Sequence, residues 1–378
     1  MKLLPGCVLV LAGVAFATCG PAPMRTHATP PATPARPVTE TIHGTTLTDP
    51  YRWLEGDITS PADPQKVTPE VVAWTDAQNR YTRDVLDNLP GRKALEDRLR
   101  PLMEVGTVTA PVIRGTRYFF SRREGSQNQA VRYWREGARG AEHVLLDPAQ
   151  LDPSGLTTIE WVSPSADGRL VAFGSYKAGD ENATLHLLDV DAGTQLPLDI
   201  PNKVESPDWL PDGSGFVYRN LKNPKDPYTG QVMFHRMGTP VDTDVVLFRQ
   251  YTAAENAALA TTWGPFGSLS HDGRWLLLGY WVDTKSNDLW LVDFDRFLKT
   301  GQIEKRVVSV GVPGTAAGSV IDNVLYLKTT KGAAKGQLVA VDAQAPDLAK
   351  ARVVVPERAD AVLEGVAFAR GRMAVSYM

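Results

Sequence analysis

Cysteine is nearly absent from this sequence. The 378 residues include only Cys7 and Cys19, both within the first twenty positions. The rest of the chain therefore has no disulfide, no thiol nucleophile and no cysteine-based zinc site. The six histidines contain no His-Glu-x-x-His pair and no short ligand spacing. The sequence accordingly predicts neither a bound metal nor a cofactor, and its stability must come from packing.

An excess of positive charge is also absent. The chain has 40 lysines and arginines against 43 aspartates and glutamates, which gives a formal net charge of −3. A protein that binds nucleic acid through a strongly basic surface is therefore not expected. Hydrophobic residues make up 43% of the chain, which is enough for at least one sizeable core and does not fit a disordered or fibrous protein.

The motifs that would mark an enzyme are missing as well. No serine has glycine at both −2 and +2, as the nucleophile elbow of many serine hydrolases requires, and the nearest run, Gly213-Ser214-Gly215, is interpreted as a hairpin turn. Residues 332–336 lack the Gly-Lys-Ser/Thr ending of a phosphate loop. Residues 189–193 begin like a calcium loop, but its twelfth position is Ile200 instead of glutamate. The sequence therefore predicts no catalytic residue.

The first 19 residues have the pattern of an export signal. Lys2 precedes an apolar run over residues 8–16, which is too short to cross a bilayer comfortably. Residues 16–20, Phe-Ala-Thr-Cys-Gly, resemble a bacterial lipobox, in which Cys19 becomes the lipidated first residue of the mature protein. We therefore predict a signal peptide over 1–19 and export from a bacterial cell, to the periplasm or as a lipoprotein anchored to a membrane through Cys19, with ordinary secretion as the alternative. Residues 20–38, rich in Pro, Thr and Ala, are predicted to form an extended linker.

Residues 39–107 are predicted to form a helical segment. Thr68 can cap a helix that has Pro69 at its first position. A second helix is predicted from about Gly91 to Gly106. Two such helices cannot bury both of their apolar stripes alone, so we expect them to pack on something larger. The stripes are Val71, Trp74, Gln78, Tyr81 and Val85 on the first helix, and Leu95, Leu99 and Leu102 on the second.

After about residue 110 the pattern changes to short strands. Four antiparallel pairs are predicted: 117–121 with 130–134, 170–176 with 185–190, 275–280 with 289–294, and 324–328 with 338–341. Comparable strands recur near six positions separated by 49, 48, 60, 51 and 46 residues, and this period is typical of propeller blades. The positions are Val112, Trp161, Trp209, Leu269, Val320 and Val366.

Three of the repeats share an Asp-Gly turn, at Asp167-Gly168, Asp212-Gly213 and Asp272-Gly273. Because such turns need glycine and a short acidic side chain for structural reasons, we assign these carboxylates no catalytic role. The sixth repeat ends in the apolar run 367–378, which stops inside its strand pattern. Half a blade leaves an edge and an apolar surface exposed, so we expect the chain to be part of a longer protein and poorly soluble alone.

The run Asp49-Pro50-Tyr51-Arg52-Trp53-Leu54-Glu55 is the most specific motif of the sequence. Together with residues 74–79, 111–120, 125–129 and 355–357, it resembles the prolyl oligopeptidase family of serine peptidases. The resemblance covers about residues 40–378. It implies a mainly β fold, a seven-bladed propeller of the prolyl oligopeptidase type after an α-helical N-terminal segment. In the family this propeller covers the active site of a C-terminal α/β-hydrolase domain and admits only short peptides.

The resemblance also implies what the chain lacks. Residues 108–378 would form an incomplete propeller that stops in its sixth blade, before the hydrolase domain that carries the catalytic Ser, Asp and His. No catalytic residue can be carried over, and the chain alone is predicted to be inactive. Propeller arginines contribute to substrate binding in the family, but no motif chooses among Arg219, Arg236 and Arg249. The expected ligands of the longer protein are short proline-containing peptides.

A second interpretation of the same sequence is a non-enzymatic propeller lipoprotein that binds a peptide or protein partner. The predicted helices at 69–103 argue against it, because the resemblance gives them the role of docking on a hydrolase domain. We therefore favour the N-terminal part of an exported, proline-specific endopeptidase.

Overall fold

The computed structural model of the chain describes residues 29–56, 67–369 and 371–378, so the predicted signal peptide and Cys19 lie outside the described residues. The chain divides into two compact units, Met1–Met103 and Glu104–Met378. Among the described residues, no helix is long and apolar enough to cross a membrane.

The first unit contains a hairpin and two helices. The hairpin consists of β1 (Val38–Ile42) and β2 (Thr45–Asp49), followed by a 3₁₀ helix at Arg52–Glu55. The helices are α1 (Pro69–Asp87) and α2 (Arg92–Met103). Thr68 caps α1 as predicted, since its Oγ1 accepts a hydrogen bond of 3.3 Å from the backbone N–H of Val71.

The predicted stripe of α1 is its least exposed face. Val71 is buried, and Trp74, Gln78, Tyr81 and Val85 are half-buried. Trp53, which belongs to the run over residues 49–55, contacts Trp74 edge to face with ring centroids 6.2 Å apart. The two tryptophan rings thus pack against each other in this unit. The leucines at positions 95, 99 and 102 of α2 are exposed.

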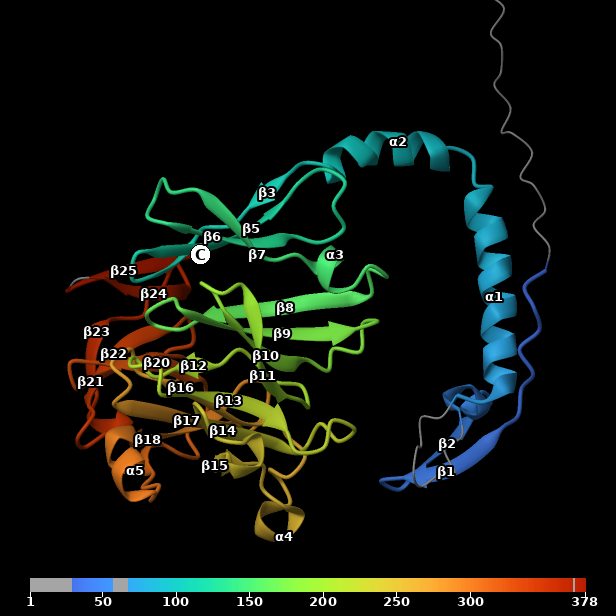
Figure 1. The fold of residues 1–378 in the computed structure, drawn as a ribbon. Helices are drawn as coiled ribbons and strands as arrows, with labels where there is room; N and C mark the ends of the chain where they lie inside the picture. The colour runs from blue at the N-terminus through green and yellow to red at the C-terminus, as the bar shows by residue number, and fades with distance from the viewer. Residues whose placement is uncertain (1–28, 57–66, 370) are drawn as a thin grey trace, which may run out of the picture. The chain divides into compact units, whose positions relative to one another are not determined.

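The second unit consists of six antiparallel sheets that follow one another along the chain (Figure 1). In the first sheet two short strands, β3 and β4, both pair with β5, which makes five strands. Each of the next four sheets has four strands paired in chain order, and the sixth has two. The strands are β3 (Thr107–Val108), β4 (Val112–Arg114), β5 (Arg117–Arg123), β6 (Val131–Glu136) and β7 (Glu142–Leu146); β8 (Thr157–Pro164), β9 (Leu170–Lys177), β10 (Thr184–Asp189) and β11 (Thr194–Ile200); β12 (Asp208–Trp209), β13 (Gly215–Leu221), β14 (Gly230–Arg236) and β15 (Val245–Arg249); β16 (Gly264–Leu269), β17 (Trp275–Trp281), β18 (Asn287–Asp293) and β19 (Arg306–Ser309); β20 (Ala316–Ile321), β21 (Val324–Thr329), β22 (Gln337–Asp342) and β23 (Arg352–Val355); and β24 (Leu363–Ala369) and β25 (Arg372–Tyr377).

This architecture confirms the predicted mainly β propeller. The four predicted pairs are β5 with β6, β9 with β10, β17 with β18, and β21 with β22. The six predicted repeat positions lie in β4, β8, β12, β16, β20 and β24. Each of these is the first strand of its sheet along the chain, except β4, which follows the short strand β3. Short helices α3 (Pro148–Leu151), α4 (Ala253–Asn256) and α5 (Phe294–Thr300) lie in the connections.

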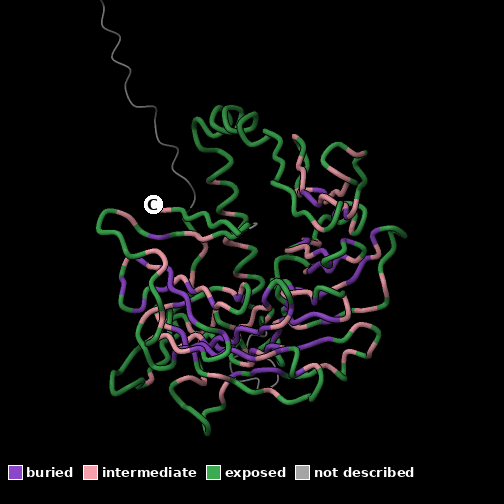
Figure 2. Tube along the Cα trace, turned by 90° about the vertical axis from the view of Figure 1, so that its left-hand side faces the viewer, coloured by how far each residue is buried: buried purple, intermediate pink, exposed green. Residues whose placement is uncertain are grey.

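The core lies between neighbouring sheets, and the buried residues concentrate in their strands (Figure 2). Strand β17 shows why the strands are apolar on both faces. Trp275 and Leu277 pack in one cluster with Leu325 of the next sheet, while Leu276 and Leu278 pack in another cluster with the preceding sheet. A sheet sandwiched between two others buries both faces, so its strands read as continuous apolar runs.

The Asp-Gly turns have the structural role that the sequence predicts. The carboxylates of Asp167, Asp212 and Asp272 each accept a hydrogen bond from the backbone N–H two residues later, at 3.0, 2.9 and 3.1 Å. The glycines that follow have φ angles of 71°, 70° and 72°, in the left-handed region.

Two of these glycines provide a matched stability test. Gly213→Ala is expected to cost about 1 kcal/mol of unfolding free energy, because alanine is strained at positive φ and its Cβ would meet nothing within 4 Å. Gly273→Ala should cost clearly more, because its Cβ would also lie 2.5 Å from Cδ of the rigid Pro211 ring. Urea unfolding measures both variants, and equal losses would contradict the packing of Gly273 against the neighbouring sheet's turn.

Candidate functional site

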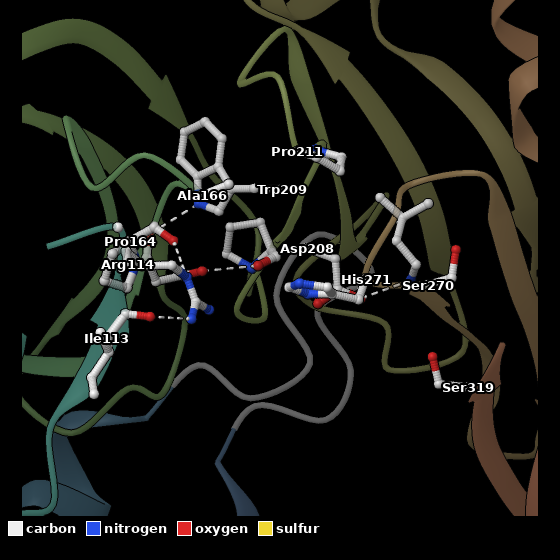
Figure 3. A pocket seen from close by; sticks show the side chains of 14 residues that line it. Ile113, Arg114, Pro164, Ala166, Asp208, Trp209, Pro211, Ser270, His271 and Ser319 are labelled. Carbon is white, nitrogen blue, oxygen red and sulfur yellow. Dashed lines mark hydrogen bonds between the residues drawn. The ribbon is translucent and has the colours of Figure 1, made fainter. Parts of the chain in front are cut away.

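The candidate site is a cavity of about 550 Å³ at one end of the sheets (Figure 3). Each of the first five sheets contributes residues from its β4, β8, β12, β16 or β20 strand to the lining. The cavity therefore lies where the successive blades converge, on the axis of the propeller. The strand residues involved are Ile113, Arg114, Ser163, Pro164, Asp208, Trp209, Leu269 and Ser319.

The Asp-Gly turns form part of the cavity rim. Ala166, Pro211 and His271 line the cavity, and each of them directly precedes the aspartate of its turn. The same position of the repeat therefore faces the axis in three successive blades. The sequence predicts the turns but not this role, although their regular recurrence is the signal that could have suggested it.

The described lining of the cavity includes one arginine and one carboxylate. Arg114 donates from Nε to the carbonyl oxygen of Pro164 at 3.4 Å and from Nη1 to that of Ile113 at 3.1 Å. Both of these Arg114 hydrogen bonds go to backbone carbonyl oxygens and neither goes to a carboxylate. Asp208 accepts a 3.0 Å hydrogen bond from the backbone N–H of Leu269. Burial raises the pKa of the Asp208 carboxyl, and this hydrogen bond partly opposes the rise.

Hydrogen bonds between blades fix the cavity wall. Trp209 Nε1 donates to the carbonyl oxygen of Ser163 at 3.0 Å, and Ser163 Oγ donates to that of Pro207 at 3.0 Å. These bonds join the second sheet to the third. The proline rings of the wall add apolar surface without N–H donors.

The hydroxyl groups of the cavity are not arranged for catalysis. The Oγ of Ser270 bonds with Asp272 and also accepts from Trp275 N at 2.9 Å, so it serves the turn. No group of three or more His, Cys, Asp and Glu side chains in the described part of the chain could hold a metal ion. The hydroxyls of Ser163 and Ser270 thus bond with a backbone carbonyl and with an aspartate of their turn, and neither bonds with a histidine in the part of the chain that the structure describes.

A Ser-His-Asp chain does occur elsewhere, on the second sheet. Ser175 Oγ lies 3.0 Å from His186 Nε2, and His186 Nδ1 lies 2.6 Å from Asp199 Oδ1. Strand β9, which carries Ser175, pairs with both β8 and β10, so its backbone N–H groups are engaged in the sheet and form no oxyanion hole. The Asp199 side chain is 63% exposed. Motif searches along the sequence miss this set because strand register brings it together.

We predict that this chain shows no inhibitor-sensitive hydrolysis of proline-containing peptides. A hydrogen-bonded serine without an oxyanion hole lacks the stabilisation that acyl transfer needs. The measurement is a peptidase assay with and without a serine-directed covalent inhibitor, on wild type and Ser175→Ala. Turnover that the inhibitor and Ser175→Ala both abolish would contradict the prediction and make Ser175 the nucleophile.

The three arginines considered from the sequence lie away from the cavity lining. Arg219 bonds with Glu205 and donates to the carbonyl oxygen of Pro265 at 2.8 Å. Arg249 forms a 2.8 Å ion pair with Glu255, and Arg236 lies over the ring of Phe234. The structure thus places Arg114 in the cavity, a residue that sequence reasoning did not single out.

Comparison with known proteins gives consistent similarities. Residues 30–378 match the family model described as "Prolyl oligopeptidase, N-terminal beta-propeller domain". The chain is 28% identical over 338 residues to a prolyl endopeptidase of Elizabethkingia meningoseptica, covering 85% of this chain and 44% of that protein. It is 26% identical over 351 residues to a dual function macrocyclase-peptidase of Amanita bisporigera, covering 84% and 45%. The chain therefore spans about half the length of these curated relatives.

Solved structures show the same fold. One, from a study of two prolyl endopeptidases and their inter-domain dynamics, superposes with a TM-score of 0.81 at 30% identity, covering 92% of this chain and 50% of that one. Prolyl oligopeptidase B of Galerina marginata, bound to a 35-residue hydrolysis and macrocyclization substrate, superposes with a TM-score of 0.77 at 22% identity, covering 92% and 50%.

Proposed function

Because the chain belongs to the prolyl oligopeptidase family, whose N-terminal β-propeller it supplies, we propose that it is the propeller part of an exported serine endopeptidase that cleaves short peptides after proline. The catalytic serine, aspartate and histidine would come from a hydrolase domain outside the 378 residues. This chain would contribute substrate selection to the reaction.

The axial cavity is the observation that carries this proposal. Its volume of about 550 Å³ is in the range of small-ligand pockets, about 300–1,000 Å³. A folded domain of 100 residues has a radius of gyration of about 13 Å and could not enter such a space. An extended peptide segment could. Selection by size is steric, so it requires walls fixed between blades, such as the Trp209–Ser163 contact, and no reactive group.

The test is to express the reading frame that continues beyond codon 378 and to assay its product. We expect a Gly-x-Ser-x-Gly elbow downstream and cleavage after proline that a serine-directed inhibitor abolishes. A frame without a hydrolase domain, or a longer product that leaves proline peptides intact, would overturn the proposal in favour of a non-enzymatic propeller.

Export through the first 19 residues is part of the same proposal, with Cys19 as the lipid-bearing residue. The apolar run 8–16 and the Pro-rich residues that follow Cys19 support it. Detergent partitioning of the wild type and of Cys19→Ser should differ, with only the wild type in the detergent phase. Recovery of both in the aqueous phase would leave ordinary secretion.

A further inference from the structure

Among the described residues that line the axial cavity, Arg114 is the one arginine or lysine, and none of its hydrogen bonds goes to a carboxylate there. Its two hydrogen bonds go to backbone carbonyl oxygens, and its Nη2 has no hydrogen-bond partner among the described residues. The arginines at 249 and 358, by contrast, each make two hydrogen bonds to one carboxylate. Arg114 therefore keeps donor capacity and charge for a ligand.

The geometry points to a peptide carboxylate as that ligand, and we propose that Arg114 binds the C-terminal carboxylate of a peptide in the cavity. This inference rests on the proposed function and deepens it by naming the substrate feature that is recognised. A guanidinium presents its N–H groups in a planar fork that matches a carboxylate. The two carbonyl bonds restrict how Arg114 can turn, so the fork is partly oriented before a ligand arrives (Figure 3).

The rest of the lining favours one position for such a carboxylate. Asp208 is the one aspartate or glutamate in the described part of the lining, and its bond to Leu269 N keeps it on the wall formed by the third and fourth sheets. A ligand carboxylate is repelled by Asp208 and attracted by Arg114, so it should bind at the first sheet. The adjoining surfaces of Pro164, Pro207 and Trp209 then offer apolar contact to the preceding residues of the peptide.

The experiment measures binding of short proline-containing peptides by fluorescence anisotropy at low ionic strength, using the monomeric fraction of the purified 378-residue chain from size-exclusion chromatography. One peptide, labelled at its N-terminus, has a free C-terminal carboxylate, and a second is the same sequence as a C-terminal amide. A third is the amide with one internal glutamate, which separates a side-chain carboxylate from the terminal one. We expect the free acid to bind about tenfold more tightly than either amide, as a charge-assisted pair permits.

Variants assign the effect to Arg114. Arg114→Gln should reduce the affinity of the acid to that of the amide. Arg169→Gln is the matched control, because Arg169 is exposed in a turn beside the cavity and does not line it. It should leave the ratio of the two affinities unchanged. Asp208→Asn removes the opposing charge and should strengthen binding of the acid.

Equal affinities of the acid and the amide for the wild type would overturn the inference, as would equal losses in Arg114→Gln and Arg169→Gln. Equal binding of the glutamate-containing amide and the acid would overturn the preference for the terminal carboxylate. None of these results bears on cleavage after proline by the longer product. Failure of this inference is therefore distinguishable from failure of the proposed function.

Discussion

His235→Ala is expected to lower the free energy of unfolding by about 3–5 kcal/mol, because it leaves one oxygen of the buried Asp244 carboxylate without a partner. His235 Nδ1 lies 2.7 Å from Asp244 Oδ1, and both side chains are 1% exposed. Tyr218 donates its hydroxyl to the other Asp244 oxygen at 2.7 Å. Burial and the Asp244 carboxylate raise the pKa of Tyr218, so this hydroxyl stays a donor throughout the neutral range.

The chain offers a matched control for this variant. His186 Nδ1 lies 2.6 Å from Asp199 Oδ1, so the geometry is similar, but the Asp199 side chain is 63% exposed and water can replace the histidine. His186→Ala should therefore cost less than about 1 kcal/mol. Urea unfolding of both variants at neutral pH measures the difference. Losses of the same size would show that water reaches the Asp244 carboxylate, which contradicts its burial in the structure.

Trp275→Ala is expected to cost about 3–5 kcal/mol, because it empties a large volume in the core between the fourth and fifth sheets. Trp275 is fully buried, and its Nε1 donates to Asn323 Oδ1 at 3.3 Å. The void left by Trp275→Ala should also loosen the contact between the fourth and fifth sheets. We therefore expect a lower melting temperature without loss of β content in circular dichroism.

Trp263→Ala is the corresponding surface control. The Trp263 side chain is 75% exposed, and such substitutions usually change stability by less than about 0.5 kcal/mol. A large loss in Trp263→Ala, or a negligible one in Trp275→Ala, would show that the blades pack differently. Because both variants remove a tryptophan, their unfolding should be followed by circular dichroism instead of fluorescence.

Local patterns allowed most of the fold to be predicted. The cap at Thr68 and the 3,4 spacing after it fixed α1, and the repeat of about 50 residues gave the blades. The β1–β2 hairpin was missed. Its turn uses His43 and Gly44 with φ angles of 50° and 79°, and histidine is not among the residues that usually signal a turn with positive φ.

The cavity could not be predicted at the level of residues. Its lining combines the ends of five strands, from Ile113 to Ser319, and their convergence depends on how each blade packs on the next. Nothing near Arg114 in the sequence distinguishes it from the other arginines. The Ser175, His186 and Asp199 contacts likewise depend on strand register, including the irregularity between His186 and Leu187 in the pairing of β10 with β11.

We propose above all that this propeller admits peptides and excludes folded proteins in a proline-specific endopeptidase. The most direct test gives the product of the extended reading frame one proline-containing sequence in two forms, as a free peptide and as a loop of a stable folded domain. We predict inhibitor-sensitive cleavage after proline in the free peptide and none in the folded domain until that domain is unfolded. Equal rates of cleavage for the two forms would contradict the claim.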